Sequence, residues 1–213
     1  MATFNKGILG GFSGKVGNVV GAHWRGLNIM RSVPPRRGPG GTPEQLMQRR
    51  KFTTVVQFLQ PIRAFLNRYY GENQGVKSRF NLATAYHLQF AVDYVDPDFE
   101  MRYNRVMVSK GDLPGAEGLT VSPMAGQVLA VSWTDNSSQS QAQSTDALLV
   151  VVFCPVLNLF TVFDNVAERS DTSVQLTLNQ VLQNEEVYIW VGFTSPALKK
   201  SATSVYAGSV TIL

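Results

Sequence analysis

The sequence is short of the side chains that most often hold metals or form cross-links. It has a single cysteine, Cys154, and two histidines, His23 and His87. One thiol excludes an intrachain disulfide and a metal site made of several cysteines. The two histidines do not have the spacing of a metal-binding pair. We therefore expect no metal site, and we expect Cys154 to be a small buried side chain in the core.

Charged residues are also few. Lys, Arg, Asp and Glu make up 16% of the 213 residues, whereas 44% are hydrophobic. A free monomer usually carries a larger share of charge on its surface. Much of this surface should therefore consist of Ser, Thr, Asn and Gln, or be covered by another subunit.

Long apolar runs are missing. No stretch approaches the roughly 18–20 apolar residues that a helix needs to cross a bilayer. The first apolar run is short, broken by glycines and interrupted by Lys15, which is unlike a secretory signal peptide. The sequence thus predicts a protein of the cytoplasm, or of a particle assembled there.

Signatures of catalysis are absent as well. Residues 10–15 are rich in glycine and end in a lysine. A phosphate-binding loop would need a glycine in place of Leu9 and a hydroxyl in place of Val16. No glycine elbow or pair of carboxylates surrounds a candidate nucleophile. We predict that the protein is not an enzyme, with no catalytic residues and no cofactor.

The charge that is present divides unevenly along the chain. Residues 1–82 hold 13 of the 19 Lys and Arg residues but only two acids, Glu44 and Glu72, which is a net charge of +11. The remaining residues have six basic and 13 acidic side chains, which is a net charge of −7. Such asymmetry predicts either a polyanionic partner for the first part of the chain or a contact between copies of the chain. The alternative is that these basic side chains are merely solvated.

The most distinctive stretch, residues 13–32, is basic and rich in glycine. Alternation over residues 16–24 predicts a strand, and residues 27–33 predict its return. Arg25 and Gly26 suit the tight turn between them, because glycine tolerates a positive φ. Two strands alone are barely stable in water, so this hairpin must dock on the helices, on the C-terminal strands or on another chain.

Residues 34–41 are rich in proline and glycine and predict an irregular connector. A helix should begin directly after it. Thr42 is a good N-cap, Pro43 suits the first helical position, and Gln45 completes a capping box. The apolar stripe of this helix continues to Pro61, which should break it because proline lacks a backbone donor.

Two further helical pieces are expected. One follows Pro61 and ends at Gly71, a fitting C-cap. The other runs over about residues 78–92. Residues 96–98, Asp-Pro-Asp, end the helical part, and the alternation of residues 99–109 predicts a strand.

The rest of the chain has an all-β texture, with turn-rich segments between short apolar runs. Seven strands in about 95 residues indicate an immunoglobulin- or fibronectin III-like β-sandwich. The predicted strands are residues 119–122, 128–133, 147–153, 159–163, 173–178, 187–193 and 205–213. The predicted fold class is therefore α+β, a β-hairpin and a helical segment followed by a β-sandwich.

We divide the chain into three parts on this basis. Residues 1–95 form the basic hairpin and helical region, residues 96–117 a connecting strand and loop, and residues 118–213 the sandwich. Residues 129–134, with an inward tryptophan, resemble the second strand of fibronectin type III domains, and residues 187–193 resemble the sixth. The missing cysteine pair favours that family over antibody domains. This resemblance concerns the fold and implies no function.

A second resemblance lies in the N-terminal pattern. It comprises Ser13–Gly21, Trp24-Arg25-Gly26, Arg31–Pro34, Thr42–Leu46 and Arg50–Phe52. This pattern resembles a family of uncharacterised bacterial proteins, a domain of unknown function, and similar patterns occur in phage and prophage proteins. The family resemblance implies no assigned activity. The phage connection implies a component of a virion or of its assembly.

We predict a non-enzymatic structural or interaction protein that self-associates. Low charge, a glycine-rich hairpin without an obvious partner and open sandwich edges all favour this. The alternative is a nucleic-acid-binding protein, although no known nucleic-acid motif is present. A surface adhesin that uses the sandwich loops is a third class. The candidate interaction residues are Trp24, Arg25, Arg31, Arg36, Arg37, Arg49, Arg50 and Lys51.

Overall fold

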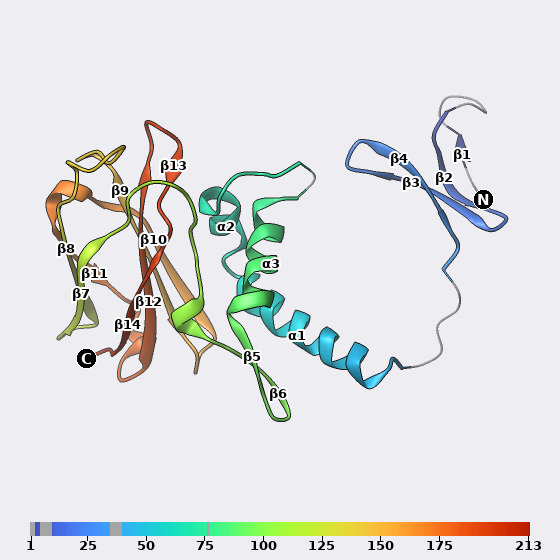
Figure 1. The fold of residues 1–213 in the computed structure, drawn as a ribbon. Helices are drawn as coiled ribbons and strands as arrows, with labels where there is room; N and C mark the ends of the chain where they lie inside the picture. The colour runs from blue at the N-terminus through green and yellow to red at the C-terminus, as the bar shows by residue number, and fades with distance from the viewer. Residues whose placement is uncertain (1–2, 5–9, 35–39, 76) are drawn as a thin grey trace. The chain divides into compact units, whose positions relative to one another are not determined.

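The computed structural model describes residues 3–4, 10–34, 40–75 and 77–213 (Figure 1). The chain divides into two compact units, Met1–Leu46 and Met47–Leu213. The boundaries expected near residues 95 and 117 do not separate units in the structure. The helices pack on the sandwich through a shared apolar core and so belong to the same unit as its strands.

The first unit is a small antiparallel sheet in the order β1-β2-β3-β4. Its strands are β1 (Thr3–Phe4), β2 (Phe12–Val16), β3 (Val19–Trp24) and β4 (Leu27–Ser32). The predicted turn is confirmed, because Arg25 and Gly26 both have a positive φ, 50° and 83°. A turn with positive φ at both central residues fits the right-handed twist of the two strands that it joins.

The single strand predicted over residues 16–24 is wrong. The chain reverses at Gly17 and Asn18, and Val16 pairs with Val19 across this turn. Gly17 has a φ of 56°, which glycine adopts without the steric penalty of a side chain. The apolar alternation continues across the turn, so the sequence pattern hides it.

The three predicted helices are present as α1 (Pro43–Leu59), α2 (Arg63–Tyr69) and α3 (Arg79–Phe90). The backbone N–H of Gln45 donates to the Thr42 hydroxyl at 3.3 Å, as an N-cap requires. The hydroxyl of Ser78 caps α3 in the same way, accepting from the N–H of Asn81 at 3.3 Å. Gly71 follows α2 with a φ of 58°, as expected of a glycine after a helix end.

A two-stranded hairpin follows α3 and projects from the second unit (Figure 1). It consists of β5 (Val92–Val95) and β6 (Asp98–Met101). The strand expected over residues 99–109 is therefore mostly wrong, since a 3₁₀ turn, η1 (Tyr103–Arg105), interrupts it. Beyond η1 the backbone finds other partners, and the N–H of Val108 donates to the Ser204 hydroxyl at 2.9 Å. These contacts replace the strand ladder that the alternation suggested.

All seven predicted sandwich strands are present, in two antiparallel sheets. One sheet has the order β11-β8-β7, and the other has β10-β9-β12-β13 with β14 paired to β12. The strands are β7 (Glu117–Met124), β8 (Val128–Thr134), β9 (Ala147–Cys154), β10 (Leu159–Glu168), β11 (Ser173–Thr177), β12 (Glu186–Ser195), β13 (Lys200–Ser201) and β14 (Val205–Thr211). The short β13 was not predicted. The fold class is α+β, as expected.

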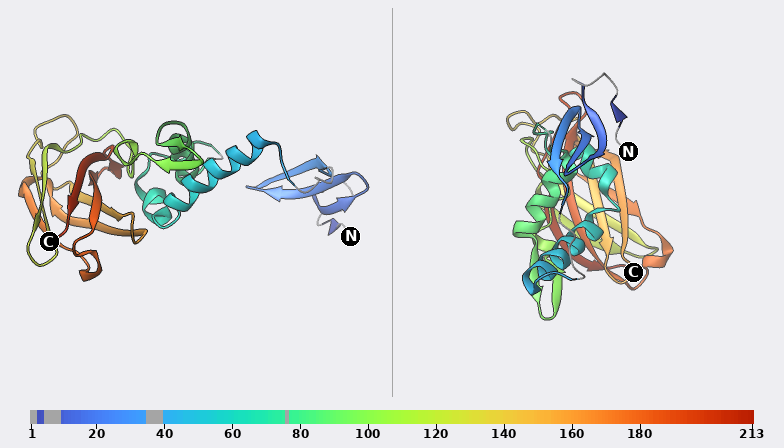
Figure 2. Two further views of the ribbon diagram at one scale, coloured as in Figure 1. Left: turned by 90° about the horizontal axis from the view of Figure 1, so that it is seen from below. Right: turned by 90° about the vertical axis from the view of Figure 1, so that its right-hand side faces the viewer.

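The second unit has three layers, in which the helices cover the outer face of the larger sheet (Figure 2). All eight residues of β9 are buried. Val150 and Val152 face the core between the two sheets, whereas Val151 and Phe153 face the helices. A strand buried on both faces is a continuous apolar run. The sequence Ala-Leu-Leu-Val-Val-Val-Phe-Cys meets this requirement.

Candidate interaction surface

One face of the N-terminal sheet gathers basic side chains. The strand register places Lys15 of β2 beside Val20 of β3, and Val20 beside Arg31 of β4. Residues directly opposite each other in a sheet share a face. Lys15 and Arg31 therefore flank Val20, two strand spacings or roughly 10 Å apart across the sheet. We call this side, with Ala22, Ile29, Trp24 and Leu27, the basic face.

The hairpin end of the basic face is aromatic. Trp24 and Leu27 are paired across the strands and are 47% and 56% exposed. The guanidinium carbon of Arg25 lies 5.0 Å from the centre of the Trp24 ring. A cation over an indole is attracted by the negative face of the ring. The contact holds a positive charge and a large apolar surface together at the tip of the hairpin.

The opposite face is partly covered by the N-terminal sheet itself. A side-chain carbon at Gly21 would lie 2.6 Å from the ring of Phe12. Glycine is needed at this position because the β2 segment lies directly against it. Further along, Nδ1 of His23 and Oδ1 of Asn28 are 2.9 Å apart. This contact joins two residues that are paired across β3 and β4.

Among its described residues, the N-terminal sheet has no apolar core. In the described part of residues 1–46, Gly21 is the one residue classed as buried, and no hydrophobic side chain is. Small sheets become stable when an apolar face packs against another element. Trp24 and Leu27, which are 47% and 56% exposed, leave such a surface open on the basic face. The basic face is thus an incomplete surface that another molecule could cover.

Three of the eight candidate residues, Trp24, Arg25 and Arg31, lie in the β3–β4 hairpin, and of these Arg25 contacts Trp24. Arg36 and Arg37 lie outside the described residues. Arg49, Arg50 and Lys51 are on α1, in the second unit. Of these, Arg50 lies near the β5–β6 turn, where its Nη1 is 3.5 Å from the carbonyl oxygen of Pro97.

Lys15 belongs to the basic face but was not among the candidates. Its place depends on the β2–β3 turn, which brings Lys15 opposite Val20. The single strand predicted over residues 16–24 left Lys15 outside the hairpin and so did not place it beside Arg31. The signal that could have found it is the Gly-Asn pair between two apolar runs, a common hairpin turn.

A family model matches residues 11–208, almost the whole chain. The chain belongs to DUF6266, a family of unknown function. The N-terminal resemblance to a domain of unknown function is confirmed. No curated protein matches this DUF6266 chain.

Several solved structures resemble the DUF6266 protein over roughly half its length. The fn3 domain of human collagen alpha-1(XX) chain has a TM-score of 0.35 at 16% identity and covers 46% of this chain and 85% of that one. The FN5 domain of Drosophila Lar has a TM-score of 0.35 at 14% identity, covering 48% and 96%. The fn3 domain of human contactin 1 has a TM-score of 0.33 at 9% identity, covering 49% and 83%.

The two side chains best suited to catalysis are both inside the protein. The ring of His87 is buried, with Nδ1 2.7 Å from the carbonyl oxygen of Ala83, and the N–H of Met107 donates to Nε2 at 3.3 Å. Burial lowers the pKa of His87 to about 4, so the ring is neutral at pH 7. Cys154 is buried in the core between the two sheets. Neither side chain is open to a substrate.

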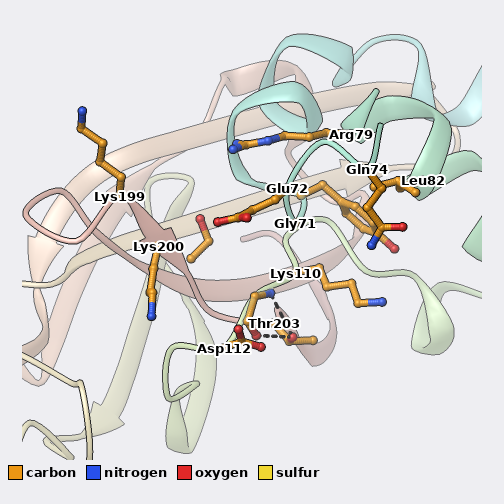
Figure 3. A pocket seen from close by; sticks show the side chains of 13 residues that line it. Gly71, Glu72, Gln74, Arg79, Leu82, Lys110, Asp112, Lys199, Lys200 and Thr203 are labelled. Atoms are coloured by element: carbon orange, nitrogen blue, oxygen red, sulfur yellow. Dashed lines mark hydrogen bonds between the residues drawn. The ribbon is translucent and has the colours of Figure 1, made fainter. Parts of the chain in front are cut away.

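The second unit of the DUF6266 protein also has a polar cavity of about 570 Å³. Its charged lining residues are Glu72, Arg79, Lys110, Asp112, Lys199 and Lys200. Figure 3 shows that the side chains of Lys110, Lys199 and Lys200 extend in different directions. The guanidinium of Arg79 donates a hydrogen bond to the carbonyl oxygen of Arg68. The cavity therefore mixes both charge signs and does not focus them on one point.

No helix among the described residues is both long and apolar enough to cross a membrane. In the same part of the chain, no group of three or more His, Cys, Asp or Glu side chains has an arrangement that could hold a metal ion.

Proposed function

We propose that this DUF6266 protein is a non-enzymatic structural protein that self-associates through the basic face of its N-terminal sheet. The observation that carries the proposal is the open apolar surface of that sheet. Trp24 and Leu27 lie side by side and are about half exposed. Fully burying a large apolar side chain contributes roughly 1.5–3 kcal/mol. Covering this pair would therefore stabilise both the sheet and the contact.

The edge of the sheet supports the same role. Among the described strands, β4 pairs on one side with β3 and stands at the end of the sheet order. An edge strand leaves backbone donors and acceptors free to pair with a strand of another molecule. Apolar contact and strand addition can act together at this edge. Arg31 on β4 would then determine which charges the partner must present.

The second unit suits the role of a rigid body in an assembly. Its two cores share the strand β9, so the helices and both sheets are held as one unit. The resemblance to phage and prophage proteins fits a subunit of a particle such as a virion. In this proposal the protein acts in the cytoplasm or in such an assembled particle.

Self-association is tested by measuring the mass of the full-length chain in solution across concentrations. Analytical ultracentrifugation or native mass spectrometry should show species larger than one chain at micromolar concentration. The double variant Trp24→Ser/Leu27→Ser should shift the wild-type equilibrium toward monomer by at least tenfold. The matched control is Val156→Ser, which removes an exposed apolar side chain from the second unit. A wild-type chain that remains monomeric at high micromolar concentration would refute the proposal.

Nucleic-acid binding is a second candidate, and the basic face favours it independently. Lys15, Arg31 and the exposed Trp24 share one side of the sheet. Single-stranded nucleic acids bind surfaces on which cations contact phosphates and aromatic rings stack on bases. Titration with single-stranded DNA and RNA at two salt concentrations tests this, since phosphate contacts weaken steeply as salt rises. Absence of binding at low salt would remove this candidate.

A further inference from the structure

The β5–β6 hairpin is the most acidic part of the second unit. Residues 92–101 contain four acids and no Lys or Arg. The register pairs Asp93 with Glu100 and Val95 with Asp98, so these four residues share one face. We call this side the acidic face. The other side is apolar and includes Tyr94 and Phe99, which pack ring to ring at 5.2 Å.

The acidic face is only partly neutralised within the chain. Asp93 forms an ion pair with Arg102. Asp98 and Glu100 are exposed, and within the described residues neither has an ion pair closer than 4 Å. Like charges opposite each other on a sheet destabilise it. A positive surface placed on this face would relieve the repulsion between Asp93 and Glu100.

The hairpin also has the open edges and apolar surface that a partner needs. In the described part of the chain, β5 and β6 pair only with each other. Tyr94 and Val95 are both 48% exposed. Two-stranded ribbons are at best marginally stable in water. Like the N-terminal sheet, the hairpin thus has unpaired strand edges and exposed apolar side chains, but its charge is of the opposite sign.

We propose that the basic face of one copy binds the β5–β6 hairpin of a second copy, so that copies join head to tail. This inference rests on the proposed self-association and names its partner surface. Lys15 and Arg31 would meet Asp98 and Glu100, and Trp24 and Leu27 would cover Val95. The basic face carries Lys15 and Arg31 with Arg25 at its tip, whereas the acidic face carries three acids, so the charges of the two surfaces are complementary. Complementary charge steers encounter and fixes register in such contacts.

A head-to-tail contact has a consequence that a symmetric one lacks. Each copy has one basic face and one β5–β6 hairpin, which are two different surfaces. Such contacts produce rings where the rotation closes and open filaments where it does not. A contact between two identical sheets would instead stop at a dimer. The assembly should therefore contain more than two copies at high concentration.

Two variants, each defective on one surface, test the pairing. The sheet variant is Trp24→Ser/Leu27→Ser, and the hairpin variant is Asp98→Lys/Glu100→Lys. Each variant alone should self-associate more weakly, with a dissociation constant at least tenfold larger than that of the wild type. Mixed in equal amounts, they should form a dimer with one copy of each, because the sheet variant keeps its hairpin and the hairpin variant keeps its sheet. Native mass spectrometry distinguishes this dimer from monomers and from higher species.

The control for the change of charge is Glu72→Lys/Asp112→Lys, which makes the same substitutions at two exposed sites of the second unit. It should associate like the wild type, and circular dichroism confirms the fold of every variant. If the hairpin variant associates normally while the sheet variant does not, self-association stands and the hairpin is not its partner. If the wild type is monomeric, the proposed function fails together with this inference. If the mixture yields only monomers, the head-to-tail pairing is overturned.

Discussion

Arg169 and Asp146 form an ion pair inside the sandwich unit, with Nη2 and Oδ2 3.1 Å apart and both side chains fully buried. The guanidinium also donates to the carbonyl oxygen of Pro114 at 3.0 Å and to Asn136. Its central carbon lies 4.0 Å from the centre of the Phe193 ring. The pair thus joins the loops at one end of the sandwich.

Removing one partner of this pair should destabilise the second unit strongly. A charge left buried without its partner costs roughly 3–5 kcal/mol. We expect Asp146→Ala to lower the free energy of unfolding by that amount, measured by urea denaturation with tryptophan fluorescence. The control is Arg68→Gln, which breaks the exposed 2.8 Å pair with Asp164 and should cost at most about 1 kcal/mol. Equal effects of the two substitutions would contradict this account.

The stability of the protein should depend on pH through His87. Burial lowers the pKa of this ring to about 4, whereas an unfolded histidine has a pKa of 6.5. Between these values the unfolded chain binds a proton that the folded chain does not. The stabilisation is therefore complete above pH 6.5 and is lost as the pH falls toward 4. At pH 5 the loss should be about 2 kcal/mol.

The pH prediction is checked by urea denaturation at pH 7.5 and at pH 5. The control variant is His87→Gln, which removes the titrating ring and retains polar atoms at the site. It should be less stable at pH 7.5, and the difference between the two pH values should shrink by about 2 kcal/mol. An unchanged difference would assign the pH dependence to other groups.

The three tryptophans offer a direct view of the basic face. Trp133 and Trp190 are buried in the second unit, whereas Trp24 is 47% exposed. At low concentration, iodide should quench a fraction of the fluorescence that disappears in Trp24→Phe. At concentrations where copies associate, this fraction should become protected, because the partner covers Trp24. A quenchable fraction that stays constant with concentration would place Trp24 outside the contact.

Most of the helices and sandwich strands could be predicted because local signals agree with the tertiary structure. Thr42 and Ser78 cap helices, Gly71 follows one, and the apolar runs of β9 and β12 mark the centre of the larger sheet. In each case the residues that define the element lie within a few positions of one another. Short-range patterns of this kind can be recognised in the sequence without knowledge of the tertiary structure.

Two of the misses depend on residues that meet only in the folded chain, whereas the third is a local turn that the surrounding alternation hides. The β2–β3 turn at Gly17 and Asn18 interrupts an alternation that looks continuous. The segment after Met101 alternates like a strand, but side-chain hydroxyls take the place of a neighbouring strand. The Arg169–Asp146 pair joins residues 23 positions apart. Nothing in the spacing of these two residues indicates that both charges are buried.

Gly21 provides a test of the N-terminal sheet in which no side chain of the basic face is substituted. A side chain at this position would collide with Phe12, which lies against it on the opposite face. We expect Gly21→Val to distort the pairing of β2 with β3 and so to separate Lys15 from Arg31. Self-association should weaken at least tenfold, whereas urea unfolding of the second unit should be unchanged within about 0.5 kcal/mol.

The control for Gly21→Val is Ser32→Val, a valine on the same face at the exposed end of β4. It adds similar apolar bulk without a collision and should associate like the wild type. Loss of association in the first variant alone would show that the arrangement of the strands, and not only their composition, makes the surface. If both variants associate normally, the contact between copies does not depend on the register of this sheet.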